Sequence, residues 1–297
     1  MHFNEILGNN QVKEYLNNSI VNNNYLHSYL FVGTSGIGKK LIAEEFSRKI
    51  LCLETAEDNC KCKSCLCFNG NNHPDYKVIN ESGETIKVDT IRELTKKVYE
   101  KPIISNHKVY IINEADKMTQ EAQNSLLKTL EEPPEFTTII LISSNENSIL
   151  NTIKSRCMKL GFNNIADNSL QEYAKSNLSY NHLTNTMIKA WGGSIGKAIT
   201  LNENEDLYTK IEQFLDSIPS MNQIEICRLG KILYEKELIK EILDFVIVCM
   251  YENSTKDTRY LDCMKDVTTA IEHLNYNANF DMTLDNMLLK IAEKFDK

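Results

Sequence analysis

Residues 29–52 constrain the fold most strongly. In this segment a short apolar run is followed by a glycine-rich turn and then by a helical pattern. The run Tyr29–Val32 predicts a strand, and apolar residues at helical spacing predict a helix over Lys39–Cys52. The turn between them is Gly33-Thr-Ser-Gly36-Ile-Gly38-Lys39-Lys40. Strand, glycine-rich turn and helix form the P-loop arrangement, in which backbone N–H groups surround phosphates and the lysine reaches the outer ones. The alternative is a glycine-rich connection that binds no ligand.

Short apolar runs recur between helical stretches in the first half of the chain. The further runs Tyr76–Ile79, Val109–Ile112 and Ile139–Ile142 predict buried parallel strands. Helical spacing is present over Val88–Tyr99 and Ala122–Leu130, and Thr119 is placed to cap the second of these helices. The alternation predicts an α/β fold with crossover helices. After about Phe162 the sequence predicts helices, and the last one has an apolar stripe of Leu284, Met287, Leu288, Ile291 and Phe295.

Length and charge limit the class of protein. The 297 residues predict two or three domains. The net charge of −8 is concentrated in residues 201–297, which hold 11 basic and 19 acidic side chains. Because a freestanding DNA-binding protein usually has a basic face, this acidic third favours contacts with protein. The sequence has no membrane-spanning run and no secretion signal, so we expect a cytoplasmic protein without a membrane partner.

Two positions that would hold Mg²⁺ in an active P-loop site carry other residues. The residue after the P-loop lysine is usually Ser or Thr, and here it is Lys40. The strand Val109–Ile112 should end in an Asp-Glu pair, but it is followed by Asn113 and Glu114. Asp116 lies beyond the strand end, where a capping or surface role is expected. Since Mg²⁺ is central to phosphoryl transfer, we expect no ATP hydrolysis at this site. Whether the loop still binds a nucleotide stays open.

Five of the nine cysteines crowd into the short insert of residues 52–67. Four thiolates make a closed tetrahedral zinc site, and Cys62-x-x-Cys65 has the usual ligand spacing. We predict one Zn²⁺ held by Cys52, Cys60, Cys62 and Cys65, with Cys67 and His73 as the alternative ligands. Free cysteines without a metal are the other interpretation.

The tripeptide Ser155-Arg156-Cys157 follows the fourth predicted strand and a short helical segment. An exposed arginine at this place could reach the ATP of a neighbouring subunit as an arginine finger. By itself the tripeptide is weak evidence, because a solvated surface arginine has the same pattern.

Taken in order, these residues resemble the bacterial DNA polymerase III clamp loader subunits of the AAA+ family, and among them the delta-prime branch. The resemblance is carried by Ile6-Leu-Gly8-Asn-Asn, His27-Ser-Tyr-Leu-Phe31, the P-loop and cysteine insert, His73-Pro-Asp75, Ile91-Arg92, Leu126-Leu-Lys-Thr-Leu-Glu-Glu-Pro-Pro134 and Ser155-Arg-Cys157. The motor subunits of the family share the cysteines and the Ser-Arg-Cys motif, but not the altered positions Lys40 and Asn113. A third difference is Gly196, which stands where a motor subunit would place an arginine. The spacing Cys60-x-Cys62 is one residue shorter than the family's usual Cys-x-x-Cys.

The resemblance implies three domains: a RecA-like AAA+ module over residues 1–162, a helical lid over 163–204 and a helical collar over 205–297. It implies a hetero-pentameric ring with gamma- or tau-type subunits and a delta subunit, which loads a sliding clamp on primed DNA. In that ring the chain would be a stationary partner that supplies Arg156, next to Ser155, in trans. Two alternatives are an active motor ATPase of the gamma or tau type and a zinc-stabilised scaffold outside replication.

Overall fold

The computed structural model describes residues 2–80, 84–276 and 278–296, and the chain divides into two compact units, Met1–Ser169 and Leu170–Lys297. The border between the units falls inside a helix. The predicted domain boundaries at residues 162 and 204 stay predictions.

The first unit contains a five-stranded parallel sheet with the order β2-β3-β4-β1-β5. Its strands are β1 (Ser28–Val32), β2 (Tyr76–Ile79), β3 (Lys108–Ile112), β4 (Thr137–Ser143) and β5 (Met158–Gly161). The predicted parallel α/β sheet is therefore confirmed, and the four predicted strands correspond to β1–β4. The sequence did not reveal β5, because only Leu160 of this edge strand is buried and no apolar run marks it.

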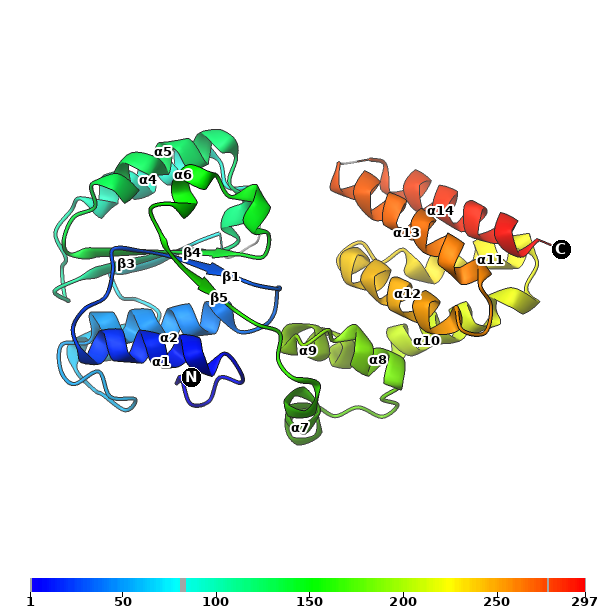
Figure 1. Ribbon diagram of the computed structural model, residues 1–297, viewed down its shortest axis with the longest axis horizontal. Coiled ribbons are helices and arrows are strands. Elements are labelled where there is room, and N and C mark those ends of the chain that lie inside the picture. The colour runs from blue at the N-terminus through cyan, green and yellow to red at the C-terminus, as the bar shows by residue number, and fades with distance from the viewer. Residues whose placement is uncertain (1, 81–83, 277, 297) are drawn as a thin grey trace. The chain divides into compact units, whose positions relative to one another are not determined.

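Helices cover both faces of the sheet (Figure 1). The helices of this unit are α1 (Asn10–Val21), α2 (Lys39–Leu51), α3 (Lys63–Asn69), α4 (Val88–Val98), α5 (Gln120–Glu131) and α6 (Asn151–Lys154). Alternate strand residues point to opposite faces, so Tyr29 and Phe31 of β1 pack with α1 and α2, while Leu30 packs with α4 and α5. The sheet is buried on both sides, as its continuous apolar strands predict.

Helix α5 begins and ends where the sequence indicates. The side chain of Thr119 accepts a hydrogen bond from the backbone N–H of Ala122 at 3.2 Å, which satisfies one of the unpaired donors of the first turn. The helix ends at Glu131, just before the predicted stop at Pro133 and Pro134.

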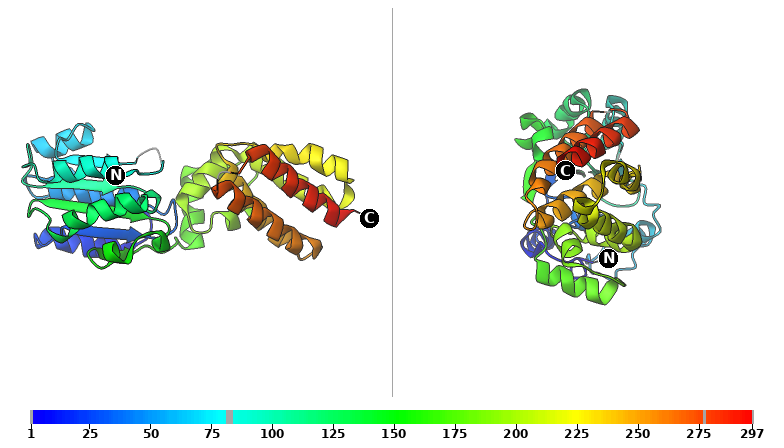
Figure 2. Two further views of the ribbon diagram at one scale, coloured as in Figure 1. Left: turned by 90° about the horizontal axis from the view of Figure 1, so that it is seen from above. Right: turned by 90° about the vertical axis from the view of Figure 1, so that its right-hand side faces the viewer.

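In the described residues of the second unit, helices are joined by turns and loops, and no strand is present. Its helices are α7 (Asp167–Asn177, which begins before the border), α8 (Asn185–Ala190), α9 (Ile195–Glu203), α10 (Glu205–Ser217), α11 (Gln223–Leu229), α12 (Ile239–Asn253), α13 (Arg259–Asn275) and α14 (Phe280–Phe295). Helices α13 and α14 run side by side (Figure 2), and the predicted apolar stripe of α14 is buried. Among the described residues, no helix combines the length and the apolar character that crossing a membrane requires.

Candidate functional site

The P-loop connects the carboxyl end of β1 to the first turn of α2. Gly36 and Gly38 have φ angles of 75° and 90°, which residues other than glycine rarely adopt. Gly33 is required for another reason, because a Cβ atom there would lie 2.6 Å from the carbonyl oxygen of Phe162. The three glycines therefore allow a tight loop at the N-terminus of α2, the arrangement in which backbone N–H groups can face an anion.

The side chain of Lys39 is folded back into this loop. It is 6% exposed, and its Nζ donates hydrogen bonds to the carbonyl oxygens of Gly33 at 2.5 Å and Thr34 at 2.6 Å. Burial lowers the pKa of Lys39 to about 8, against the opposing effect of the carboxylates of Asp116 and Glu114. The ammonium thus binds the loop's own carbonyls, and a phosphate would have to compete with them.

Lys40 takes no part in this loop. Its Nζ lies 3.8 Å from Oε1 of Glu44, one turn further along α2, and both side chains are partly exposed. Such an exposed pair contributes little stability. A cation therefore stands at the place where a P-loop hydroxyl would bind Mg²⁺.

Asn113, directly after β3, is engaged with the neighbouring strand. Its Nδ2 donates to the carbonyl oxygen of Asn80 at 3.3 Å, and Nδ2 of Asn80 donates to the carbonyl oxygen of Asn113 at 3.4 Å. Glu114 has a φ of 49° and forms an ion pair with Lys117 at 2.7 Å. Both side chains are occupied by contacts within the first unit, and Asn113 offers no negative charge to a metal.

Asp116 holds the end of β4 in place. Its carboxylate accepts hydrogen bonds from the backbone N–H of Ser144 at 3.1 Å and from the Ser144 hydroxyl at 3.3 Å. Asp116 thus bonds to Ser144 near the surface, which agrees with the expected capping or surface role.

The cysteines Cys52, Cys60, Cys62 and Cys65 come together, with all four Sγ atoms within 4.8 Å of one another. Sγ of Cys52 lies 3.6 Å from that of Cys60 and 3.9 Å from that of Cys62. A tetrahedral zinc site with Zn–S bonds of about 2.3 Å needs S–S distances of about 3.8 Å. The four cysteines are free of disulfides, so the donor set fits Zn²⁺.

Local structure explains how the short Cys60-x-Cys62 spacing is accommodated. Cys52 directly follows α2, and Cys62 is the N-cap of α3, where its Sγ accepts a hydrogen bond from the backbone N–H of Cys65 at 3.4 Å. Burial raises the pKa of the Cys62 thiol. Hydrogen bonds from the backbone N–H groups of Cys65 and Leu53 and from the thiols of Cys65 and Cys60 lower it, and the pKa falls to about 7. The site is built from two helix ends and the loop between them.

Neither alternative zinc ligand belongs to this group. Cys67 lies outside the set of four clustered sulfurs. Nε2 of buried His73 lies 2.8 Å from the Ser64 hydroxyl and 3.2 Å from that of Ser105, and its Nδ1 accepts from the backbone N–H of Asp75. Asp75, 1% exposed, accepts three backbone hydrogen bonds from residues 103–105. The His73-Pro-Asp75 motif therefore ties the cysteine insert to the loop before β3.

Sequence reasoning missed a second group of possible metal ligands, His2, Glu45 and Asp58. Nδ1 of His2 lies 3.5 Å from Glu45 and 3.8 Å from Asp58. Arg48 already binds Glu45 at 2.7 Å, and Lys49 binds Asp58 at 3.1 Å. Because two cations neutralise these carboxylates, the group joins the N-terminal segment to α2 and does not offer a free metal site.

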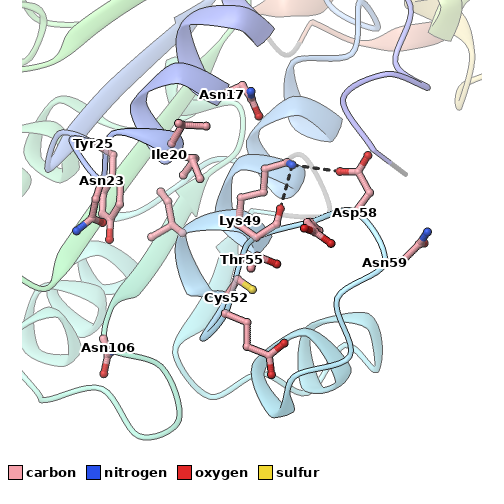
Figure 3. Close-up of a pocket in the computed structure, with 15 residues that line it drawn as sticks. Asn17, Ile20, Asn23, Tyr25, Lys49, Cys52, Thr55, Asp58, Asn59 and Asn106 are labelled. Carbon is pink, nitrogen blue, oxygen red and sulfur yellow. Dashed lines mark hydrogen bonds and ion pairs between the residues drawn. The ribbon is translucent and has the colours of Figure 1, made fainter.

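An open pocket of about 920 Å³ lies beside this group, between α1, the end of α2 and residues 54–59 (Figure 3). Lys49 crosses it and donates hydrogen bonds to Asp58 and to the carbonyl oxygen of Ala56, both at 3.1 Å. Several asparagine side chains line the rest of the pocket. Of the predicted zinc ligands, Cys52 lines the pocket, together with residues 54–59 of the cysteine insert.

Arg156 lies on the surface of the first unit, between α6 and β5. Its Nη2 lies 2.5 Å from Oε1 of Glu131, and its Nη1 donates to the carbonyl oxygen of Thr152 at 2.8 Å and to the Ser155 hydroxyl at 3.3 Å. Its own carbonyl oxygen accepts from the buried Ser28 hydroxyl at 2.7 Å. The backbone of Arg156 is therefore fixed, while its side chain stays 33% exposed.

Gln123 is a further residue that the sequence did not single out. This buried side chain donates to the carbonyl oxygen of Ser148 at 2.9 Å and accepts from the backbone N–H of Leu150 at 2.8 Å. It links α5 to the segment that leads into α6 and Ser155. The available signal was an amide side chain on the helix face that also carries Ala122, Leu126 and Leu130.

The predicted sensor position Gly196 lies in the second unit, in the first turn of α9. Ser194 caps this helix by accepting a hydrogen bond from the backbone N–H of Lys197 at 3.2 Å. Gly196 provides no side chain that could contact a phosphate.

A protein family described as "DNA polymerase III, delta subunit" matches residues 8–166, more than half of the chain. The chain belongs to this family. The family predicted from the sequence is thereby confirmed, and the matched range contains the P-loop, the cysteine cluster and Arg156. These three sites lie in the part that defines a DNA polymerase III delta family member.

Relatives of this family member carry two kinds of name. "DNA polymerase III subunit delta'" of Bacillus subtilis is 32% identical over 197 residues, which is 66% of this chain and 60% of the relative. "DNA polymerase III subunit tau/gamma" of Haemophilus influenzae is 30% identical over 209 residues, 68% of this chain but only 30% of the relative. A gamma subunit-related protein of Thermotoga maritima shares the fold, with a TM-score of 0.55 and 16% identity, over 96% of this chain and 99% of that protein.

Proposed function

We propose that this chain acts as a delta-prime-type subunit of a bacterial clamp loader and does not hydrolyse ATP itself. The observation that carries the proposal is the state of the P-loop. Lys40, at the position of the metal ligand, pairs with Glu44, and Lys39 binds the loop's own carbonyl oxygens. The amide of Asn113 donates a hydrogen bond to the carbonyl oxygen of Asn80, and this residue has no carboxylate to offer a metal. Without these contacts Mg²⁺ has no site from which to bridge the β- and γ-phosphates.

The proposed architecture is a RecA-like AAA+ module with a zinc-binding insert, followed by a helical lid and a helical collar. The acidic composition of residues 201–297 supports a collar that contacts other subunits in the cytoplasm. The partners we propose are gamma- or tau-type subunits and a delta subunit in a hetero-pentameric ring. Sliding clamp and primed DNA would be contacted through that complex.

Arg156 would then act in trans on the ATP of an adjacent motor subunit. The fixed backbone and partly exposed guanidinium of Arg156 support this role. A planar guanidinium can make two parallel hydrogen bonds to a phosphoryl group, which a lysine cannot. Arginine fingers contribute factors of roughly 10³ to 10⁵ to the rate at a single site.

Zinc would have a structural role in this protein. Cys52, Cys60, Cys62 and Cys65 would hold it, and the bound ion would fix the insert to the end of α2. The site has no open ligand position for chemistry once four sulfurs are bound.

An active motor ATPase is the alternative function, and the relatives named tau or gamma support it. An ATPase assay of the isolated chain distinguishes the two functions. We expect no Mg²⁺-dependent ATP turnover from it, and a single Lys40→Thr change should not restore activity because Asn113 is still present. Robust turnover by the wild-type chain that is lost in Lys39→Ala would replace our proposal with the motor function.

The arginine finger is tested in the assembled complex with gamma- or tau-type and delta subunits. We expect Arg156→Ala and Arg156→Lys to assemble normally but to lower DNA-stimulated ATPase activity and clamp loading. The loss in total turnover can be smaller than the single-site factor, because other sites in the ring share the work. Lys159→Ala, an exposed cation nearby, is the control. Unchanged activity of a well-assembled Arg156→Ala complex would refute the role in trans.

A further inference from the structure

The contact between Arg156 and Glu131 joins the proposed finger to the end of α5. Helices α5 and α6 pack against each other (Figure 1), so Glu131 at the end of one helix reaches Arg156 just after the other. The two side chains meet at 2.5 Å, a short charge-assisted hydrogen bond.

The position of Glu131 is unfavourable for a carboxylate by itself. It is the last residue of α5, where the unpaired carbonyl groups and the helix dipole repel negative charge. The guanidinium of Arg156 supplies the opposite charge at this helix end. The adjacent carboxylate of Glu132 makes no ion pair within the described parts of the chain, so the two glutamates form a matched pair for comparison.

The contacts of Arg156 leave part of its guanidinium free. Of its five N–H donors, Nη1 uses two on Thr152 and Ser155 and Nη2 uses one on Glu131. No bond from Nε is found among the residues that the structure describes. One edge of the planar group is therefore held by the first unit, and the remaining donors can face an external anion.

We propose that Glu131 is a positioning residue for Arg156. It holds the guanidinium in the orientation in which its free donors meet a phosphate on the neighbouring subunit. This inference rests on the proposed function, because it needs Arg156 to act in trans. Glu131 itself would contact neither ATP nor Mg²⁺.

The test uses the assembled complex with Glu131→Gln, Glu132→Gln, Arg156→Ala and the double change Glu131→Gln with Arg156→Ala. Because an exposed ion pair orders its partners only modestly, we expect Glu131→Gln to lower kcat for DNA-stimulated ATPase about three- to fivefold. The KM for ATP and the yield of assembled complex should stay at wild-type values, which a purely structural defect would not allow. Glu132→Gln should match wild type.

In the Arg156→Ala background, Glu131→Gln should have no further effect. A second, independent loss there would overturn the proposal, and so would a rise in kcat, because Glu131 would then restrain the arginine. If Arg156→Ala lowers turnover and Glu131→Gln behaves like Glu132→Gln, only the positioning role fails. If Arg156→Ala leaves turnover unchanged, the function in trans fails and the positioning role fails with it.

Discussion

Replacing Cys62 by serine gives the sharpest test of the proposed zinc site, because Cys62 both belongs to the sulfur cluster and caps the N-terminus of α3. Two of the S–S distances, 3.6 and 3.9 Å, lie close to the roughly 3.8 Å of a tetrahedral site, and all four sulfurs lie within 4.8 Å of one another, so the ligands are already gathered for binding. Structural zinc in small peptides contributes roughly 10 to 16 kcal/mol of apparent binding free energy. We expect one zinc per wild-type chain and much less in Cys62→Ser.

The damage should be local. Neither apolar core of the first unit includes a residue from 52 to 67. Hydrogen exchange should therefore become fast in residues 53–66, while the amides of β1 and β3 keep their protection. Chelation of zinc from the wild-type protein should have the same effect.

Cys67→Ser is the matched control, since Cys67 lies in α3 but outside the cluster. It should retain zinc and normal exchange. A full complement of zinc in Cys62→Ser, or loss of zinc in Cys67→Ser, would show that the ligand set is wrong. Zinc-free wild-type protein with a protected insert would refute the metal site altogether.

Three further changes test other parts of the first unit. Gly33→Ala should lower the free energy of unfolding by about 1 to 3 kcal/mol, because the new Cβ atom meets the carbonyl oxygen of Phe162. Gly161→Ala is the control, since the space around its Cβ position is open, and it should be neutral in the same denaturation assay. Burial lowers the pKa of Lys39 from 10.5 to about 8, so the unfolded chain binds one more proton than the folded chain between these pH values. The free energy of unfolding should therefore rise by up to about 3 kcal/mol between pH 8 and 10.5. Lys39→Met should abolish this rise, and equal pH profiles of the two proteins would contradict the reasoning. Asp75→Asn should lower the free energy of unfolding by about 3 kcal/mol, because it places an amide N–H₂ group against three backbone donors. Asp89→Asn, which loses only an exposed pair with Arg92 and a first-turn charge, should cost less than about 1 kcal/mol, and equal losses in both variants would contradict this.

The sequence could predict most of the sheet because the central strands are buried on both faces. Such strands need unbroken apolar runs, and β3 and β4 are fully buried. The edge strand β5 needs only Leu160 to face the core, so it leaves no pattern. Helix α5 was equally predictable from the sequence, because Thr119 caps its start and the two prolines stop it.

The candidate sites were predictable where they depend on spacing and hidden where they depend on distant partners. The cysteines lie close in sequence and meet across one short loop. By contrast, Asn80 and Asn113 are 33 residues apart, and Glu131 and Arg156 are 25 apart. The sequence showed that Asn113 cannot replace a carboxylate, but only the parallel pairing of β2 with β3 brings it to Asn80.

The order of the strands also determines which of them are open to pairing with a strand of another molecule. The outermost strands β2 and β5 each contain four residues, and each carries an exposed lysine, Lys77 and Lys159. Short, charged outer strands make poor templates for a strand from another molecule. The fully buried strands β3 and β4 are enclosed between neighbouring strands and have no free hydrogen-bonding side. The two edges of this sheet are therefore poorly suited to edge-to-edge aggregation of the first unit.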